Sequence, residues 1–107
     1  MQRYGNVVKV RPEKFEEYKR LHAAAWPRVL EMLTECNFRN FSIFHKNGYL
    51  FSYYEYVGED IDADNARIIA DPVCREWDRV CGLCMEPLET RGTNDPWLPM
   101  EELFHLD

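Results

Sequence analysis

Blocks of apolar and polar positions predict a strand followed by a long helix at the start of the chain. Residues 2–10 contain three β-branched valines and are predicted to form the strand. A helix should open at Pro12, because proline fits a first helical turn and the glutamates after it complement the positive end of the helix dipole. We expect this helix to run to about Cys36, with a bend at Pro27, where one backbone hydrogen bond is lost. Asn37 suits the position just beyond its end.

An aromatic-rich hairpin is predicted next. Residues 38–46 and 49–56 are strand candidates, and Asn47 and Gly48 between them form a two-residue turn signal. The type I′ turn that joins such strands needs a positive φ at both positions, which asparagine and glycine tolerate best. The polar residues 58–60 then end the second strand of the hairpin.

Two further helices and a last strand complete the predicted elements. Residues 61–70 form the first of these helices, and the second should begin at Asp71 and Pro72, a favourable pair of N-cap and first-turn residues. We expect this second helix to run to about Met85. Residues 101–106 alternate weakly between apolar and polar side chains and are predicted to close the sheet.

The order of these elements predicts the fold class. Strand, helix, strand, strand, helix pair, strand is the order of an α+β protein with the ferredoxin-like split βαβ sandwich. The 107 residues match the size of one domain, spanning 1–107. One helical layer covers only one face of a sheet, so the other face must be buried by different means. Packing two sheets together in a homodimer is the simplest solution.

The charge balance excludes several classes of partner. Lysine and arginine number 13 against 19 aspartates and glutamates, which gives a formal net charge of −6. This sign repels phosphate backbones and anionic lipid surfaces, so neither nucleic acid nor a membrane is an expected partner. No stretch approaches the ~18 consecutive apolar residues of a membrane span, and the first residues lack an apolar secretory segment. We therefore expect a cytoplasmic protein.

The cysteines are expected to be reduced in that compartment. Cys81 and Cys84 have the C-x-x-C spacing of some zinc and redox sites, but neither a second such pair nor paired histidines lie nearby. The segment continues a predicted helix, in which cysteine packs as a small hydrophobic residue. We therefore predict no metal site. The chain has four cysteines: Cys36, Cys74, Cys81 and Cys84.

One face of the first predicted helix carries the main candidate chemistry. Tyr18 and His22 lie one turn apart on it, and Trp26 borders them a turn later. A histidine on an apolar face is often a core residue bonded to a nearby hydroxyl or carbonyl group. Alternatively, an imidazole that transfers protons, set beside flat rings that pack against C–H groups, makes a sugar site. The whole face comprises Phe15, Tyr18, His22, Ala25, Val29 and Met32.

Two other groups of aromatic residues have open roles. Trp77, in the segment 71–78, is either a core residue near a helix start or part of a site. Most of the rings on the predicted strands are expected in the core or in a dimer interface. Two sets of strand residues share a face each: Phe41, Ile43 and His45, and Tyr54 and Tyr56.

The spacing of Tyr18, His22 and the Trp26-Pro27 pair is similar to the motif E-Y-x-x-x-H-x-x-x-W-P of the L-rhamnose mutarotase family. Further matches lie at Asn40 and Ile43, between Asp71 and Trp77, and in the segment 102–106. The chain therefore resembles this family over nearly its whole length.

The resemblance implies a dimeric α+β barrel that acts on a monosaccharide without a cofactor. It also implies that His22 is the proton donor and that Tyr18, Phe41, Glu76 and Trp77 hold the sugar, with Trp26 as a possible pocket residue. Two positions depart from the family pattern: Phe41 stands where the family has tyrosine, and Glu76 stands where it has the first tryptophan of a pair. These changes alter which sugar hydroxyls are matched, so the expected substrate is L-rhamnose, L-fucose or a related aldose.

Anomer exchange requires opening the hemiacetal ring. One group protonates the ring oxygen, and another removes the proton from the anomeric hydroxyl. We expect His22 in the first role. Glu76 is a candidate for the second, because it is at a binding position and ionised near neutral pH. Asp78, Glu101, Glu102 or an ordered water are weaker alternatives for the same role.

Two rival functions stay open for this fold. A cofactor-free monooxygenase on the same dimeric barrel would also have an apolar cavity lined by aromatic residues. A small dimeric binding protein would keep Tyr18 and His22 as core residues and catalyse nothing. Neither rival explains the Tyr/His/Trp-Pro spacing, and fold alone does not choose between functions.

Overall fold

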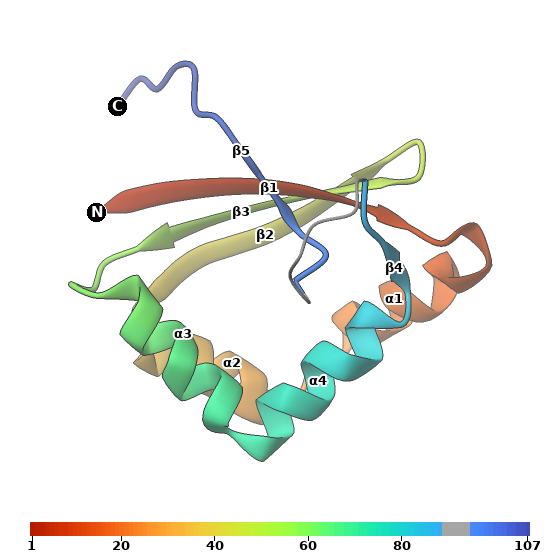
Figure 1. The fold of residues 1–107 in the computed structure, drawn as a ribbon, viewed down its shortest axis with the longest axis horizontal. Coiled ribbons are helices and arrows are strands. Elements are labelled where there is room, and N and C mark those ends of the chain that lie inside the picture. Colours follow the sequence, from red (N-terminus) through yellow and green to blue (C-terminus); the bar gives the residue numbers. More distant parts are fainter. Residues whose placement is uncertain (89–94) are drawn as a thin grey trace.

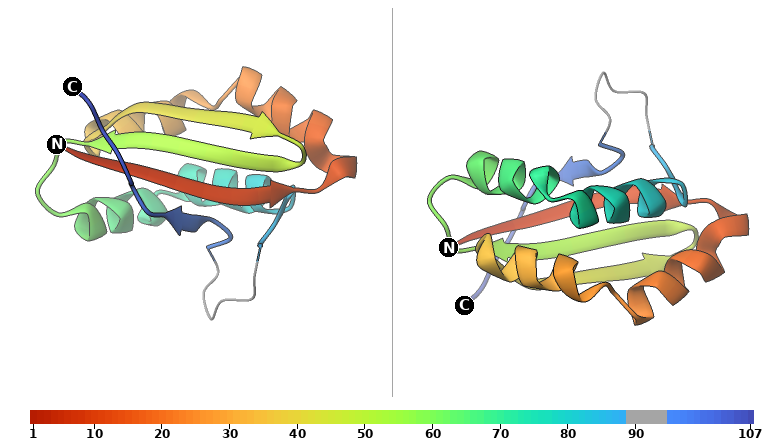
Figure 2. Two further views of the ribbon diagram at one scale, coloured as in Figure 1. Left: turned by 90° about the horizontal axis from the view of Figure 1, so that it is seen from above. Right: turned by 90° about the horizontal axis from the view of Figure 1, so that it is seen from below.

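A curved antiparallel sheet and one layer of helices build the protein (Figure 1). The structure is a computed structural model, and it describes residues 1–88 and 95–107. All the helices lie on the same face of the sheet, where they run side by side in two pairs (Figure 2). The strands are β1 (Gln2–Val10), β2 (Phe38–Lys46), β3 (Tyr49–Tyr56), β4 (Met85–Glu86) and β5 (Leu98–Met100). The helices are α1 (Phe15–Ala23), α2 (Pro27–Glu35), α3 (Ile61–Ala70) and α4 (Pro72–Gly82), with a 3₁₀ turn at Pro12–Lys14 before α1.

The sheet has the strand order β2-β3-β1-β4, all neighbours antiparallel. This order and the helical layer confirm the predicted ferredoxin-like α+β fold. The edge strand beside β1 is made of two pieces, because β4 pairs with Lys9 and Val10, whereas β5 pairs with residues 5–7 of the same strand. The chain therefore leaves the edge after β4 and returns to it with β5.

The hairpin between β2 and β3 has the predicted turn. Asn47 and Gly48 have φ values of 53° and 82°, so both adopt the left-handed conformation of a type I′ turn. A β-bulge interrupts the register of β2 after Arg39, and pairing resumes at Ser42. Asn40, inside the bulge, also has a positive φ, of 50°. The extra residue changes which side chains of β2 face the helices.

The single long helix predicted from Pro12 to Cys36 is wrong. Helix α1 ends at Ala23, and Trp26 is extended with φ −65° and ψ 129°. The residue before a proline is disfavoured in the helical region, so the chain leaves the helix and Pro27 opens a new one instead of bending the old one. Asn37, with φ 74°, adopts the left-handed conformation expected just past the end of the second helix.

Two other predicted boundaries need correction. Helix α4 does begin with the predicted cap, since Asp71 accepts hydrogen bonds from the backbone N–H groups of Val73 and Cys74. It ends at Gly82 and not at Met85, which belongs to β4. The predicted closing strand at 101–106 is also wrong, because the strand that pairs with β1 is β5. The hydrogen-bonding edge of β1 is then already occupied, and residues 101–107 continue away from the sheet on the side opposite the helices (Figure 1).

The core lies between the sheet and the helices. Alternate residues of β1 and β3 point into it, among them Val8, Val10, Leu50 and Tyr56. All four cysteines are buried there as free thiols, so the expectation that they pack as small hydrophobic residues is confirmed. No helix within 1–88 or 95–107 is long and apolar enough to cross a membrane.

Candidate functional site

Tyr18 and His22 form the centre of the helical wall of the candidate site. Both project from α1, and their rings stack with centroids 4.1 Å apart. The Nδ1–H of His22 donates to the carbonyl oxygen of Tyr18 over 2.8 Å, since a carbonyl can only accept. This bond fixes the tautomer and leaves Nε2 as the ring nitrogen without a hydrogen bond to any described residue. His22 thus combines the two alternatives considered for it: it is bonded to a carbonyl, and it keeps one reactive nitrogen.

The protonation state of His22 follows from its partial burial. Burial lowers the pKa of the imidazole from its ordinary value of 6.5, and the hydrogen bond to Tyr18 offsets this only in part. Near neutral pH the ring is therefore mostly neutral. Small changes in its surroundings, such as a bound polar ligand, can then change its charge.

The Tyr18 hydroxyl is a buried polar group without a partner. The residue is 3% exposed, and within the described chain its oxygen has no hydrogen bond. Burial, with the nearby thiols of Cys81 and Cys84, raises the pKa of this phenol, so it remains a neutral donor. An orphaned buried hydroxyl is costly and needs an explanation, which a bound ligand can provide.

Two tryptophans border the imidazole. The ring of Trp77, on α4, meets His22 edge-on with centroids 5.1 Å apart, and Trp26 lies 5.1 Å from Trp77 in the same manner. Helices α2 and α4 are held together near this point by Arg28, whose Nε donates to Asp71 over 3.0 Å. Asp71 also caps α4, so one carboxylate both starts the helix and positions it.

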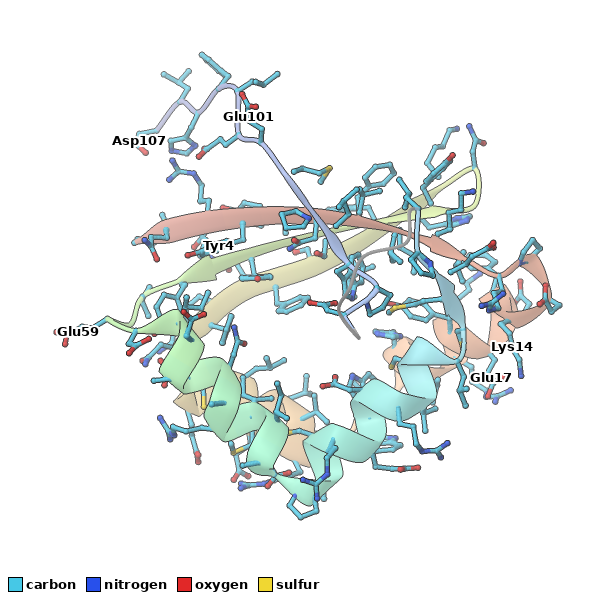
Figure 3. The ribbon with its side chains drawn as sticks, viewed as in Figure 1. Tyr4, Lys14, Glu17, Glu59, Glu101 and Asp107 are labelled. Carbon is cyan, nitrogen blue, oxygen red and sulfur yellow. The ribbon has the colours of Figure 1, made fainter. Side chains whose placement is uncertain are left out.

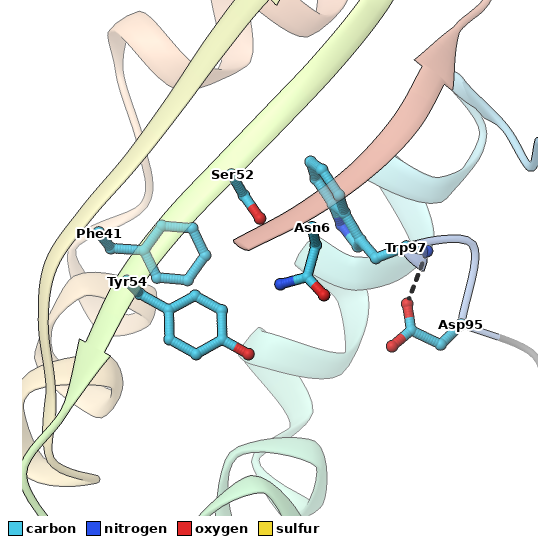
Figure 4. Close-up of a pocket in the computed structure, with 6 residues that line it drawn as sticks. All are labelled: Asn6, Phe41, Ser52, Tyr54, Asp95 and Trp97. Atoms are coloured by element: carbon cyan, nitrogen blue, oxygen red, sulfur yellow. Dashed lines mark hydrogen bonds between the residues drawn. The ribbon is translucent and has the colours of Figure 1, made fainter. Parts of the chain in front are cut away.

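A second wall is formed by the sheet and the segment before β5. A cavity of about 100 Å³ lies there (Figure 4). Phe41 and Tyr54 stack on one side of it, with centroids 5.0 Å apart. Ser52, which is 4% exposed, adds a hydroxyl group to this wall. The residues that line the cavity are Asn6, Phe41, Ser52, Tyr54, Asp95 and Trp97.

The β-bulge places Phe41 in this wall. Arg39 and Ser42 pair with Glu55 and Tyr53 on the outer face, so two residues of β2 stand opposite Tyr54 alone. Without the extra residue, strict alternation would turn Phe41 outward. The bulge thus brings its ring onto Tyr54, on the face that the helices cover.

The structure brings most of the predicted site residues together. Tyr18, His22, Trp26 and Trp77 form one aromatic cluster on the helices, and Phe41 lies on the inner face of the sheet. Tyr18, Trp26 and Trp77 belong to the core cluster between the two layers, whereas Phe41 is 43% exposed. Side chains of the sheet and of α4 project into the space between the layers (Figure 3).

Glu76 is not part of this arrangement. It is exposed on α4, where its carboxylate accepts two hydrogen bonds from Arg79, at 2.9 and 2.6 Å. Neighbouring helix positions differ by ~100° around the axis, so Glu76 and Trp77 point in different directions. The pairing with Arg79 lowers the pKa of Glu76, which makes it a weaker proton acceptor than an unpaired carboxylate.

Five lining residues were missed from the sequence: Asn6, Ser52, Tyr54, Asp95 and Trp97. The first two did carry a signal, because they are small polar residues at inward positions of strands that are otherwise apolar on that face. Trp97 stands out only as a lone large ring in a proline-rich stretch. Asp95 has no local signal that points to a site.

Comparisons with known proteins identify the family of the chain. A sequence model of a family described as L-rhamnose mutarotase matches residues 3–106. The L-rhamnose mutarotase of Lactiplantibacillus plantarum is 33% identical over 111 residues, covering 100% of both chains. That of Bacillus subtilis is 33% identical over 114 residues, again covering 100% of both.

Solved structures share the fold at lower sequence identity. The crystal structure of an L-rhamnose mutarotase from Formosa agariphila has a TM-score of 0.77 at 19% identity, covering 100% of each chain. Tetracenomycin F2 cyclase from Streptomyces glaucescens has a TM-score of 0.69 at 16% identity, also over 100% of each chain. The fold is therefore shared by a mutarotase and a cyclase and does not choose between the two activities. The family match and the full-length relatives do: the chain belongs to the L-rhamnose mutarotase family, which confirms the expectation of a sugar mutarotase.

Proposed function

We propose that this protein interconverts the α and β anomers of a 6-deoxy-L-hexose, with L-rhamnose as the first candidate and L-fucose as the alternative. One observation carries the proposal: the His22 imidazole is held by Tyr18 through Nδ1 and has Nε2 free beside aromatic rings. A proton-transfer group against flat rings fits a sugar, whose C–H face packs on aromatic side chains. The names of the full-length relatives support L-rhamnose as the substrate.

In the proposed reaction His22 exchanges a proton with the ring oxygen. The protonated form of His22, with protons on both ring nitrogens, gives its Nε2 proton to this oxygen, and the bond between the oxygen and the anomeric carbon breaks. A second group takes the proton of the anomeric hydroxyl. The open aldehyde rotates about its C1–C2 bond and closes on the other face. Each group then returns to its starting state, as a catalyst must.

The proposed sugar contacts are Tyr18, Trp77 and Phe41, with Trp26 at the border. The unpaired Tyr18 hydroxyl would gain a hydrogen bond from the sugar, which is worth more in a buried site than at the surface. Glu76 remains a proposed contact to a sugar hydroxyl, but its carboxylate would have to leave Arg79. Glu76→Gln tests it, because a raised KM with unchanged kcat is expected of a lost hydroxyl contact.

We also propose that the protein is a homodimer in which two sheets pack face to face. The face of the sheet away from the helices carries Phe44, which is 64% exposed and pairs with Phe51 of β3. Leu103, Phe104 and Leu106 on the last segment are between 79% and 86% exposed. An apolar surface of this kind is typical of an interface. The four free thiols suit the reducing cytoplasm, which is the proposed compartment.

Saturation-transfer NMR tests the proposed activity directly. One anomeric proton of L-rhamnose is saturated, and the loss of signal at the other anomer reports the exchange rate above that of buffer. L-fucose and D-galactose in parallel samples rank the substrates. Exchange at the buffer rate with all three sugars would contradict the proposal. Oxygen consumption with an aromatic substrate would favour the monooxygenase, and sugar binding without exchange would favour the binding protein.

A further inference from the structure

A polar pair, Asn6 and Ser52, interrupts the inner face of the sheet beside Phe41. Asn6 on β1 and Ser52 on β3 are direct cross-strand partners. Both line the cavity that is bordered by the rings of Phe41 and Tyr54 (Figure 4). We infer that the polar pair binds hydroxyl groups of the sugar and so determines which aldose the enzyme accepts. This inference rests on the proposed mutarotase function and goes further by naming residues that set its specificity.

The register of the two strands makes the polar pair stand out. Side chains alternate between the two faces of a strand, so neighbouring inward pairs of β1 and β3 are two residues apart. Val8 pairs with Leu50 on one side of the polar pair, and these residues are 0% and 1% exposed. Tyr4 pairs with Tyr54 on the other side, where the two rings stack with centroids 5.2 Å apart. The polar pair therefore lies in the middle of a face that is otherwise apolar and aromatic.

Burial makes the polar pair costly for the fold alone. Ser52 is 4% exposed, and Asn6 is half-buried. A buried polar group must replace the hydrogen bonds that it loses to water, and an alanine or valine at the same position has no such requirement. A sugar supplies these hydrogen bonds, because hydroxyl groups and amides both donate and accept. The polar pair thus fits ligand binding better than core packing.

The size of the cavity fits one edge of a sugar. It holds about 100 Å³, whereas pockets that enclose a whole small ligand measure ~300–1,000 Å³. Only part of a sugar ring can therefore enter it. Tyr54 and Trp97 pack against the buried cluster of the core, which includes Tyr18. His22 stacks on Tyr18, so the rest of the sugar would extend from the cavity towards His22.

The other residues of the lining favour a neutral sugar. Phe41 and Tyr54 stack with centroids 5.0 Å apart and offer a flat surface to C–H groups. Asp95 adds a carboxylate, which is oriented by the 3.0 Å hydrogen bond that its Oδ1 accepts from the backbone N–H of Trp97 (Figure 4). A carboxylate accepts hydrogen bonds from hydroxyl groups and repels phosphate and acid groups. The expected ligand edge is thus a set of free hydroxyl groups on an uncharged ring.

Two variants test this assignment by saturation-transfer NMR at several concentrations of L-rhamnose, or of L-fucose if that sugar exchanges faster. Asn6→Ala and Ser52→Ala should each raise KM roughly 3- to 10-fold, the effect of one hydrogen bond between neutral groups, and leave kcat unchanged. Asn65→Ala and Thr34→Val are the matched controls, because they remove an amide and a hydroxyl group from exposed positions on α3 and α2. Both controls should keep the wild-type KM, and melting curves verify that every variant is folded.

Deoxy sugars identify the hydroxyl group that each residue binds, and with the wild-type protein they require no variant. Three analogues of L-rhamnose each lack one further hydroxyl group, at C2, C3 or C4. The wild-type KM should rise roughly 3- to 10-fold for an analogue whose missing hydroxyl group contacts the polar pair. In the variant that lacks the matching side chain, this analogue and L-rhamnose should have equal KM values, because the interaction is already absent.

The outcomes separate this inference from the proposed function. An unchanged KM in both folded variants would overturn the role of the polar pair while the mutarotase activity stands. So would equal KM values for L-rhamnose and all three analogues in the wild type, or KM ratios among the sugars that the variants leave unchanged. A lower kcat at unchanged KM would also overturn it, since the pair would then act on the chemical step and not on binding. A wild-type protein that exchanges no sugar anomers would instead remove the proposed function.

Discussion

The imidazole of His22 and the indole of Trp77 meet edge-on, with centroids 5.1 Å apart and planes inclined by 61°. The first residue lies on α1 and the second on α4, so their contact depends on how both helices pack against the sheet. Trp77 occupies one side of the imidazole, and Tyr18 occupies another. This enclosure lowers the pKa of His22 and leaves Nε2 as its reactive atom.

Replacing this imidazole should abolish most of the activity. His22→Ala is expected to lower the anomer exchange rate by about 10²–10⁴-fold, the usual contribution of one proton-transfer group. His45→Ala is the control, because His45 stacks on Phe15 near the hairpin and takes no part in the site. Saturation-transfer NMR measures both rates, and a melting curve verifies folding. Wild-type exchange in a folded His22→Ala protein would remove His22 from the mechanism.

Removing the Tyr18 hydroxyl should weaken sugar binding without loss of stability. Because this oxygen has no hydrogen-bond partner among the described residues, Tyr18→Phe should not lower the free energy of unfolding. It should raise this free energy by at most about 1–3 kcal/mol, the cost of an unsatisfied buried polar group. Sugar affinity should fall, because the site loses a buried donor. Urea denaturation and NMR titration measure the two effects.

Tyr56→Phe is the matched control for this experiment. The Tyr56 hydroxyl donates to Asp64 over 2.6 Å and accepts from the backbone N–H of Asp60 over 3.1 Å. Its removal leaves buried partners unsatisfied, so it should destabilise the fold by about 1–3 kcal/mol. A Tyr18→Phe protein as destabilised as this control would contradict the ligand role of Tyr18.

The outer face of the sheet should control assembly. Phe44→Asp places a carboxylate in the proposed interface, and burying an unpaired charge costs more than the ~1.4 kcal/mol of a tenfold change in Kd. We expect the dimer Kd to rise at least about tenfold, measured by sedimentation equilibrium. Ile69→Asp, at an exposed apolar position on α3, is the control. Equal dissociation constants in the two variants would argue against packing through the sheets.

The stability of the fold should depend on one buried carboxylate in acid. Hydrogen bonds from Tyr56 first, and then from Asn37, lower the pKa of Asp64 from its ordinary value of 3.8. A lowered pKa means that the carboxylate stabilises the fold fully above pH 3.8, and that this contribution is lost as the pH falls through the lower value of the folded state.

Asp64→Asn should therefore lower the melting temperature at neutral pH and flatten its fall in acid. Melting temperatures of the two proteins between about pH 2 and 7 provide the comparison. Parallel curves for wild type and variant would show that other carboxylates govern the acid sensitivity.

Local pattern was sufficient for the elements that are long and periodic. The strand at 2–10, the hairpin around Asn47 and Gly48 and the helix at 61–70 follow from alternation, turn chemistry and capping, all of which act between near neighbours in the chain. Tyr18 and His22 were paired correctly for the same reason, since one helical turn separates them.

Long-range packing decided the remaining features. The break before Pro27 follows from a local restriction, but where the second helix lies depends on its contacts with α4 and the sheet. Strands β4 and β5 are too short for a periodic signal, and only pairing with β1 defines them. The same pairing places Asp95 and Trp97 beside Phe41 in the cavity, although no spacing along the chain relates them to this residue. Residues far apart in the sequence come together only when the sheet and the helices pack, and the free energy of this packing is a sum over contacts throughout the folded chain.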